Sequence, residues 1–139
     1  MKQRILTAVI SIAIAFTGIA SFASAVSAAS DDKYSYSFYN MNQAANTAAK
    51  DKYTSRKVYI HPTSGPILKY TVQGYDGTEW ENRSSTHKVQ NGVQASFTNF
   101  VYENHEPKAR VHLKRTTQAY TNSNGYWNPD PSKVYTVFK

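Results

Sequence analysis

The chain has 139 residues, with sixteen Lys and Arg, nine Asp and Glu and a formal net charge of +7. It has no cysteine, which excludes disulfides, thiolate zinc sites and a cysteine nucleophile. The positive charge is moderate and is not the dense charge of a nucleic-acid arm, so we expect no nucleic-acid partner. Anionic polymers or lipid head groups are the partners that such a charge favours.

The first thirty residues have the three parts of a secretory signal peptide. Lys2 and Arg4 give a basic start, residues 5–25 are almost wholly apolar or small, and small residues follow. The positions that suit cleavage are Ala25, Ala28 and Ala29. The apolar run is also about long enough to span a bilayer, so an uncleaved membrane anchor is the alternative.

We therefore predict a signal peptide over residues 1–28 and one secreted domain over residues 29–139. Loss of the leader removes two basic residues and leaves fourteen basic against nine acidic ones, a net charge of +5 with His neutral. No second segment is apolar enough to enter a membrane, so no transmembrane segment is expected in the mature chain.

Period-two alternation of apolar and polar residues, typical of half-buried strands, dominates the mature chain. The alternating segments are residues 34–38, 57–60, 67–75, 78–82, 86–90, 93–102, 108–114 and 134–138. Alternation slips near Asn99 and Phe100, where we expect a bulge. Residues 39–56 are poor in large apolar groups; Met41 and four alanines at helical spacing predict a short helix, and an Asn-rich loop is the alternative.

Turn residues separate these segments. Gly77 after Asp76 and Gly92 after Asn91 predict tight hairpin turns, because Gly tolerates the positive φ that such turns require. Residues 63–66, 122–125 and 128–131 also have the composition of turns. About seven short strands with frequent turns predict an all-β fold, a small antiparallel β-sandwich or barrel.

Catalytic motifs are weak. Glu79 and Glu81 flank Trp80 and would lie on one face of a strand, an arrangement found in sugar-cleaving sites, but such a small domain forms too small a cleft. The four histidines lack the spacing of a metalloprotease motif; they are His61, His87, His105 and His112. We expect no enzymatic activity, no cofactor and no metal.

A basic, aromatic sheet face is the most coherent feature. Alternation places Lys69 with Tyr75, and Arg110 with Lys114, on shared faces, and the face becomes continuous if their strands are neighbours. Guanidinium forks and aromatic rings suit phosphate or sugar polymers. Lys and Arg are also ordinary occupants of the wet face of an antiparallel sheet. The candidate binding residues are Lys57, Tyr59, Lys69, Tyr75, Arg110, His112, Lys114 and Arg115.

The layout resembles a known family. The opening Tyr34-Ser35-Tyr36-Ser37-Phe38 and the closing Gly125-Tyr126-Trp127-Asn128-Pro129-Asp130 are similar to an uncharacterised family of small secreted proteins of Gram-positive bacteria. The closing motif is also weakly similar to lactococcin-type bacteriocins. The resemblance implies secretion and a β-rich fold, and it carries over no catalytic residue.

These patterns together predict a non-enzymatic protein that is secreted or associated with the cell wall. The favoured role is binding of an anionic wall polymer or a membrane surface through the basic face. The alternative is a secreted, bacteriocin-like antagonist of other cells. Strand order, the convergence of the basic residues and the oligomeric state are not encoded in these patterns.

Overall fold

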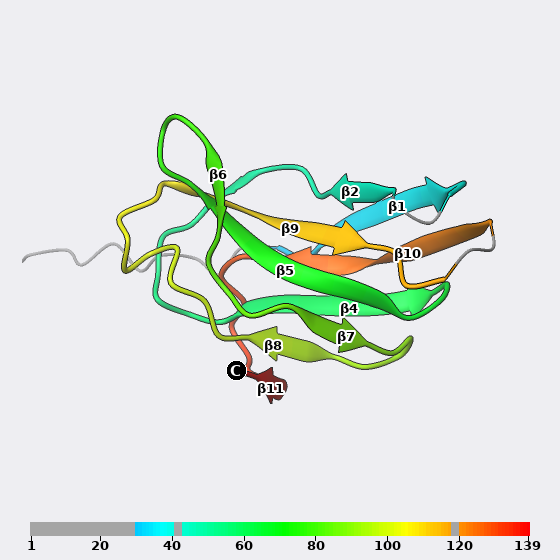
Figure 1. Cartoon of the computed structure of the whole chain (residues 1–139). Helices are drawn as coiled ribbons and strands as arrows, with labels where there is room; N and C mark the ends of the chain where they lie inside the picture. Colours follow the sequence, from blue (N-terminus) through cyan, green and yellow to red (C-terminus); the bar gives the residue numbers. More distant parts are fainter. Residues whose placement is uncertain (1–29, 41–42, 118–119) are drawn as a thin grey trace, which may run out of the picture.

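The computed structural model describes residues 30–40, 43–117 and 120–139, and these residues form a β-sandwich of eleven strands without a helix (Figure 1). The predicted leader and Met41 lie outside the described residues. Two sheets pack against each other, and the described strands form no closed barrel. The all-β sandwich is confirmed, with more and shorter strands than expected. No described helix could cross a bilayer.

The first sheet has the strand order β1-β10-β4-β8-β11. Its strands are β1 (Asp32–Phe38), β10 (Thr121–Asn128), β4 (Val58–Ser64), β8 (Ala95–Phe97) and β11 (Thr136–Phe138). The pairs are antiparallel except that β11 runs parallel to β8.

The second sheet has the order β2-β9-β5-β6, with β3 beside β9 and β7 beside β5. Its strands are β2 (Ala44–Asn46), β3 (Lys50–Asp51), β5 (Leu68–Tyr75), β6 (Trp80–Asn82), β7 (His87–Val89) and β9 (Lys108–Lys114). All of its pairs are antiparallel.

Alternate residues of the paired strands meet between the sheets. Leu68, Tyr70 and Val72 of β5 and Leu113 of β9 are fully buried, which confirms the predicted faces of both strands. Each large apolar side chain removed from water stabilises the fold by about 1.5–3 kcal/mol. The Tyr34 hydroxyl lies 3.2 Å from that of Tyr70, so one hydrogen bond joins the two layers inside the core.

The opening and closing motifs pair with each other. In the β1–β10 ladder Tyr34 lies opposite Gly125. A Cβ at position 125 would lie 2.5 Å from both the Tyr34 hydroxyl oxygen and the His61 carbonyl oxygen, so only glycine fits there. The prediction of a turn at residues 122–125 is therefore wrong: this segment lies inside β10, with a register shift between Asn124 and Gly125.

The segment 39–56 also differs from its prediction. Its described residues form no helix, and the short strands β2 and β3 pair with β9 instead. Thr47 reinforces this pairing, since its backbone N–H donates to the Val111 carbonyl and its hydroxyl accepts from the Val111 N–H, both at 2.9 Å. Small side chains bury too little to hold a helix on the core, whereas pairing with β9 satisfies their backbone groups.

The Asn91-Gly92 turn is confirmed as a turn, with φ of 84° at Gly92, but it does not make a hairpin. It carries the chain from β7 in one sheet to β8 in the other. The predicted strand over residues 93–102 is limited to β8. Asn99 ends that strand by bonding to the Phe97 carbonyl at 3.2 Å, so the slip in alternation is a strand end and not a bulge.

Candidate binding surface

The outward face of the second sheet carries three lysines in a row on neighbouring strands. Lys69 of β5 lies opposite Lys114 of β9 on one side and Lys88 of β7 on the other, and all three are exposed. Like charges directly opposite one another are destabilising, because their Cβ atoms lie only about 4.5–5.5 Å apart. The sheet thus concentrates positive charge that its own stability does not require.

Arg110 extends this charge along β9 onto an aromatic platform. Its guanidinium carbon lies 4.2 Å from the centre of the Trp80 ring, and its Nε donates to Gln73 Oε1 at 2.8 Å. The ring centroids of Tyr75 and Trp80 are 5.2 Å apart. Desolvation lowers the pKa of Arg110, but a guanidinium stays charged in proteins.

His112 lies between Arg110 and Lys114 on the same face of β9, and its Nδ1 is 2.8 Å from Asn46 Oδ1. Desolvation, followed by the charges of Arg110 and Lys114, lowers the pKa of His112 from its usual value. Burial and the two neighbouring cations therefore favour the neutral imidazole, which offers a hydrogen bond without adding charge.

No ion pair neutralises these cations within the described parts of the chain, where ion pairs involve only Lys50, Lys52 and Arg83. Asp51 lies in register with Lys108 at the far end of β9, and it accepts a hydrogen bond from the Tyr53 hydroxyl. We call this surface the basic face; it consists of Lys69, Tyr75, Trp80, Lys88, Arg110, His112 and Lys114.

Three predicted residues are not part of the basic face. Lys57 lies just before β4 and Tyr59 lies within it, and β4 belongs to the other sheet. Tyr59 is only 4% exposed, its ring is 4.9 Å from that of Tyr135, and desolvation, as the main cause, raises its pKa to about 12. Arg115 follows β9 on the inward side and is 3% exposed. Sequence alternation gives the faces of a strand but not its neighbours, so it could not separate Lys57 and Tyr59 from the others. Arg115 differs, because it continues the inward alternation of Val111 and Leu113.

Trp80 and Lys88 are functional candidates that the sequence did not assign to this face. Their places follow from the register, which sets Trp80 opposite Tyr75 and Lys88 opposite Lys69. The sequence pattern instead places Trp80 between the carboxylates of Glu79 and Glu81. In the structure the carboxylate oxygens of Glu79, Glu81 and Asp76 lie within 4.8 Å of one another. Trp80 stacks under Arg110 and is no platform for these acids.

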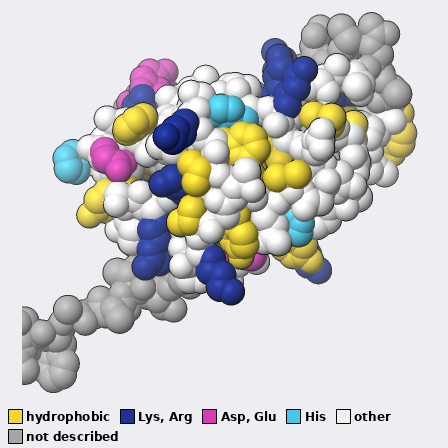
Figure 2. Space-filling model, turned by 90° about the horizontal axis from the view of Figure 1, so that it is seen from below, with side chains coloured by type: hydrophobic (Ala, Val, Ile, Leu, Met, Phe, Trp, Pro, Cys, Tyr) yellow, Lys and Arg dark blue, Asp and Glu magenta, His cyan; other side chains and the backbone are white. Residues whose placement is uncertain are grey.

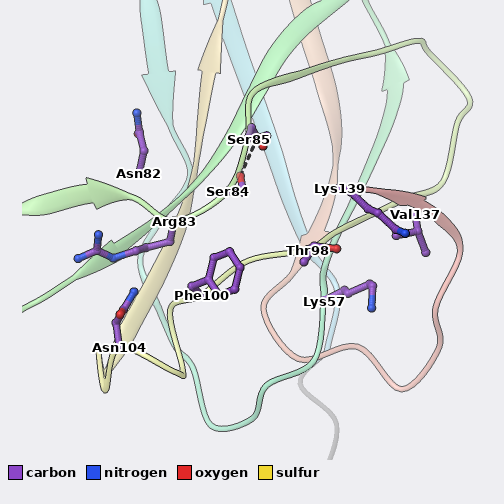
Figure 3. Close-up of a pocket in the computed structure, with 10 residues that line it drawn as sticks. All are labelled: Lys57, Asn82, Arg83, Ser84, Ser85, Thr98, Phe100, Asn104, Val137 and Lys139. Carbon is purple, nitrogen blue, oxygen red and sulfur yellow. Dashed lines mark hydrogen bonds between the residues drawn. The ribbon is translucent and has the colours of Figure 1, made fainter.

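A groove of about 990 Å³ opens beside the basic face. Figure 2, a view from below, shows hydrophobic side chains bordered by Lys and Arg on this side of the molecule. The residues that line the groove are Lys57, Asn82, Arg83, Ser84, Ser85, Thr98, Phe100, Asn104, Val137 and Lys139 (Figure 3). They come from segments far apart in the chain, and the sequence did not predict the groove. Its one sequence-level mark is the slip in alternation at Phe100.

The groove and the basic face share a chain of hydrogen bonds. Gln73 accepts from Arg110 Nε and donates through its own Nε2 to Asn82 Oδ1 at 3.0 Å. Asn82 lines the groove, and Arg110 belongs to the basic face. The two surfaces are therefore adjacent at the β6 edge of the sheet.

Comparison with known proteins identifies a family of unknown function. Residues 19–131 match the family described as "Protein of unknown function (DUF2712)", so the chain belongs to this family. Searches of curated proteins and of solved structures found no match. The resemblance to an uncharacterised family is thus confirmed.

Proposed function

We propose that the protein is a non-enzymatic, exported protein that binds an anionic cell-wall polymer through the basic face. The observation that carries this proposal is the row formed by Lys88, Lys69 and Lys114 across three strands, with no acidic partner among the described residues. A polymer with repeated phosphate groups offers the row several negative charges at once. Ammonium and guanidinium groups form strong, charge-assisted hydrogen bonds with phosphate oxygens.

The aromatic part of the face supports the same ligand class. Arg110 is held over Trp80 and by Gln73, so its guanidinium needs little further ordering to meet a phosphate. Tyr75 and Trp80 provide an apolar surface on which a sugar or polyol unit between two phosphates can lie. Since the charges are exposed, the binding free energy should weaken with salt.

Export is the second part of the proposal and rests on the sequence of residues 1–28. Cleavage after Ala25, Ala28 or Ala29 would start the mature protein at Val26, Ala29 or Ser30. N-terminal sequencing of protein recovered from the medium and from the wall fraction tests this directly. A chain that keeps residues 1–25 and remains with the membrane would overturn cleavage in favour of the uncleaved anchor, and a chain found only in the cytoplasm would overturn export.

Retention on isolated Gram-positive walls tests the binding role. We expect purified protein to be retained by walls that contain teichoic acid, to be released as salt rises, and to bind stripped walls poorly. The double variant Arg110→Ala, Lys114→Ala should lose retention. The variant Lys133→Ala, an exposed lysine outside the basic face, should keep it. Equal binding to stripped walls, or equal binding by the double variant, would overturn the proposal. Vesicles with anionic lipids serve as the membrane comparison.

A bacteriocin-like antagonist is the second candidate, and it rests on the similarity of residues 125–130 to the ends of lactococcin-type bacteriocins. It predicts that the protein inhibits the growth of related strains. Inhibition without wall retention would favour this role over polymer binding.

A further inference from the structure

We propose that the groove is a second binding site, for an acidic oligosaccharide whose sugar rings carry carboxylate groups. The groove uses none of the residues of the basic face, so this site is distinct from the polymer site proposed above. Three features carry the inference: an exposed aromatic ring, a set of unused hydrogen-bonding groups and positive charge at one end.

Phe100 supplies the aromatic ring. Its side chain is 58% exposed, although its backbone is fixed by a 2.9 Å hydrogen bond from its N–H to the Arg83 carbonyl. Figure 3 shows the ring in the middle of the groove. The electron-rich face of such a ring attracts the C–H groups of a sugar, and contact removes apolar surface of both from water.

The walls supply the hydrogen-bonding groups. The side chains of Ser85, Thr98 and Asn104 make no hydrogen bond to any described residue, and all three line the groove. Sugar hydroxyls can both donate to and accept from such groups. The lining is largely apolar, but an acyl chain would leave these three polar side chains without partners on binding, which costs free energy, so they favour a sugar over a lipid tail.

Positive charge lies at one end of the groove. Lys57 and Lys139 project there beside Val137 and have no ion-pair partner among the described residues (Figure 3). Arg83, at the other end, is already neutralised by Glu106, which is 3% exposed, and by Glu81. Charge complementarity therefore favours a ligand with an anionic group at the end of the groove where Lys57 and Lys139 lie.

The position of the charge favours a carboxylate on the sugar ring. A phosphodiester polymer carries its charge in the links between units. A uronic-acid unit carries it on the ring, so one ring can lie on Phe100 while the carboxylate of that ring or its neighbour points toward Lys57 and Lys139. A short chain of uronic acids fits this description.

Titration calorimetry with a linear tetramer of galacturonic acid tests the proposal, with the neutral galactose tetramer as the comparison ligand. We expect the acidic tetramer to bind more tightly than the neutral one. Phe100→Ala and the double variant Lys57→Gln, Lys139→Gln should each weaken its binding about tenfold or more, since each removes an interaction of about 1.4 kcal/mol or more.

Matched controls separate this site from the basic face. Tyr39→Ala removes another exposed aromatic ring, and Lys133→Gln removes another exposed lysine; both should bind the tetramer like the unaltered protein. The double variant Lys69→Gln, Lys114→Gln should also bind the tetramer normally, although it should no longer bind teichoic acid. The groove proposal fails if the acidic tetramer does not bind, if the neutral one binds equally well, or if Phe100→Ala leaves binding intact.

Discussion

Lys52 and Asp130 form a fully buried ion pair across 78 positions of the chain, with Nζ 2.7 Å from Oδ1 and side chains 0% and 2% exposed. The ammonium also donates to the carbonyls of Thr54 and Arg56, at 2.6 and 2.8 Å, so all three of its N–H groups are used. The carboxylate also accepts from the Tyr53 N–H at 2.8 Å and from the Thr54 hydroxyl. This ion pair and its hydrogen bonds connect the segment that follows β3 to the segment that follows β10.

Asp130→Asn should destabilise the protein strongly, because it leaves the buried Lys52 ammonium without a counter-ion. Breaking one side of a buried pair costs about 3–5 kcal/mol. Adding Lys52→Met should recover part of the loss, since the buried charge is gone, and the Asn side chain can still accept from the Tyr53 N–H through its oxygen while its NH2 group donates to the Thr54 hydroxyl oxygen. Urea unfolding of both variants measures this; a double variant less stable than Asp130→Asn alone would contradict the account.

Gly125→Ala should destabilise β10 because the new methyl group would press on Tyr34 and on the His61 carbonyl. Overpacking of this kind costs about 1–3 kcal/mol or more. Gly77→Ala is the comparison: it has φ of 105° but no atom within 4 Å of the added Cβ, so its loss comes from backbone conformation alone. Thermal unfolding should rank Gly125→Ala as the less stable variant, and the reverse order would argue against this packing.

Alkaline pH should unfold the protein through its buried tyrosines. Burial raises the pKa of Tyr34 and of Tyr70 above the usual value near 10, so the folded state keeps these phenol protons where the unfolded state loses them. Their contribution to stability is complete below pH 10 and falls above it, by at most about 1.4 kcal/mol per pH unit for each group.

Urea unfolding at pH 9 and pH 11 measures this loss, and Tyr34→Phe should reduce the difference between the two. A spectrophotometric titration should also show phenols that ionise only when the protein unfolds. Ionisation of every tyrosine near pH 10 in the folded protein would contradict the burial of this pair.

The lysine row should lower stability while it supports binding. Lys69→Gln removes repulsion with Lys114 and Lys88 at once, so we expect an increase in the free energy of unfolding of about 0.2–1 kcal/mol at low salt. The increase should shrink at high salt, which screens the repulsion in the unaltered protein. Lys133→Gln serves as the comparison, and an equal gain from it would show that the row has no special cost.

The extent of strand β9, and which side chains of β5 are buried, could be predicted from the sequence, because apolar and polar residues alternate in both strands. The segment 122–125 could not, because Asn, Ser and Gly favour turns, and only the close approach of Tyr34 and the His61 carbonyl explains the glycine inside a strand. The short strands β2 and β3 were also not predictable. Their own residues do not favour a strand, and they become strands because they pair with β9.

The candidate site was predictable in part for the same reason. Alternation along β5 and β9 selects Lys69, Tyr75, Arg110 and Lys114, but only the strand order shows that these two strands are neighbours. Lys57 has the same sequence pattern and lies elsewhere. The groove depends on chain segments whose proximity is a tertiary property, so the slip in alternation at Phe100 could not by itself predict it.

The most direct test of the central claim is the affinity of the purified protein for purified teichoic acid, measured over a salt series. We compare the unaltered protein with the triple variant Lys69→Gln, Lys88→Gln, Lys114→Gln. If the basic face is the binding surface, the unaltered protein binds with an affinity that falls steeply with salt, and the triple variant binds weakly with a shallow salt dependence. Equal affinity and equal salt dependence for the two proteins would contradict the claim.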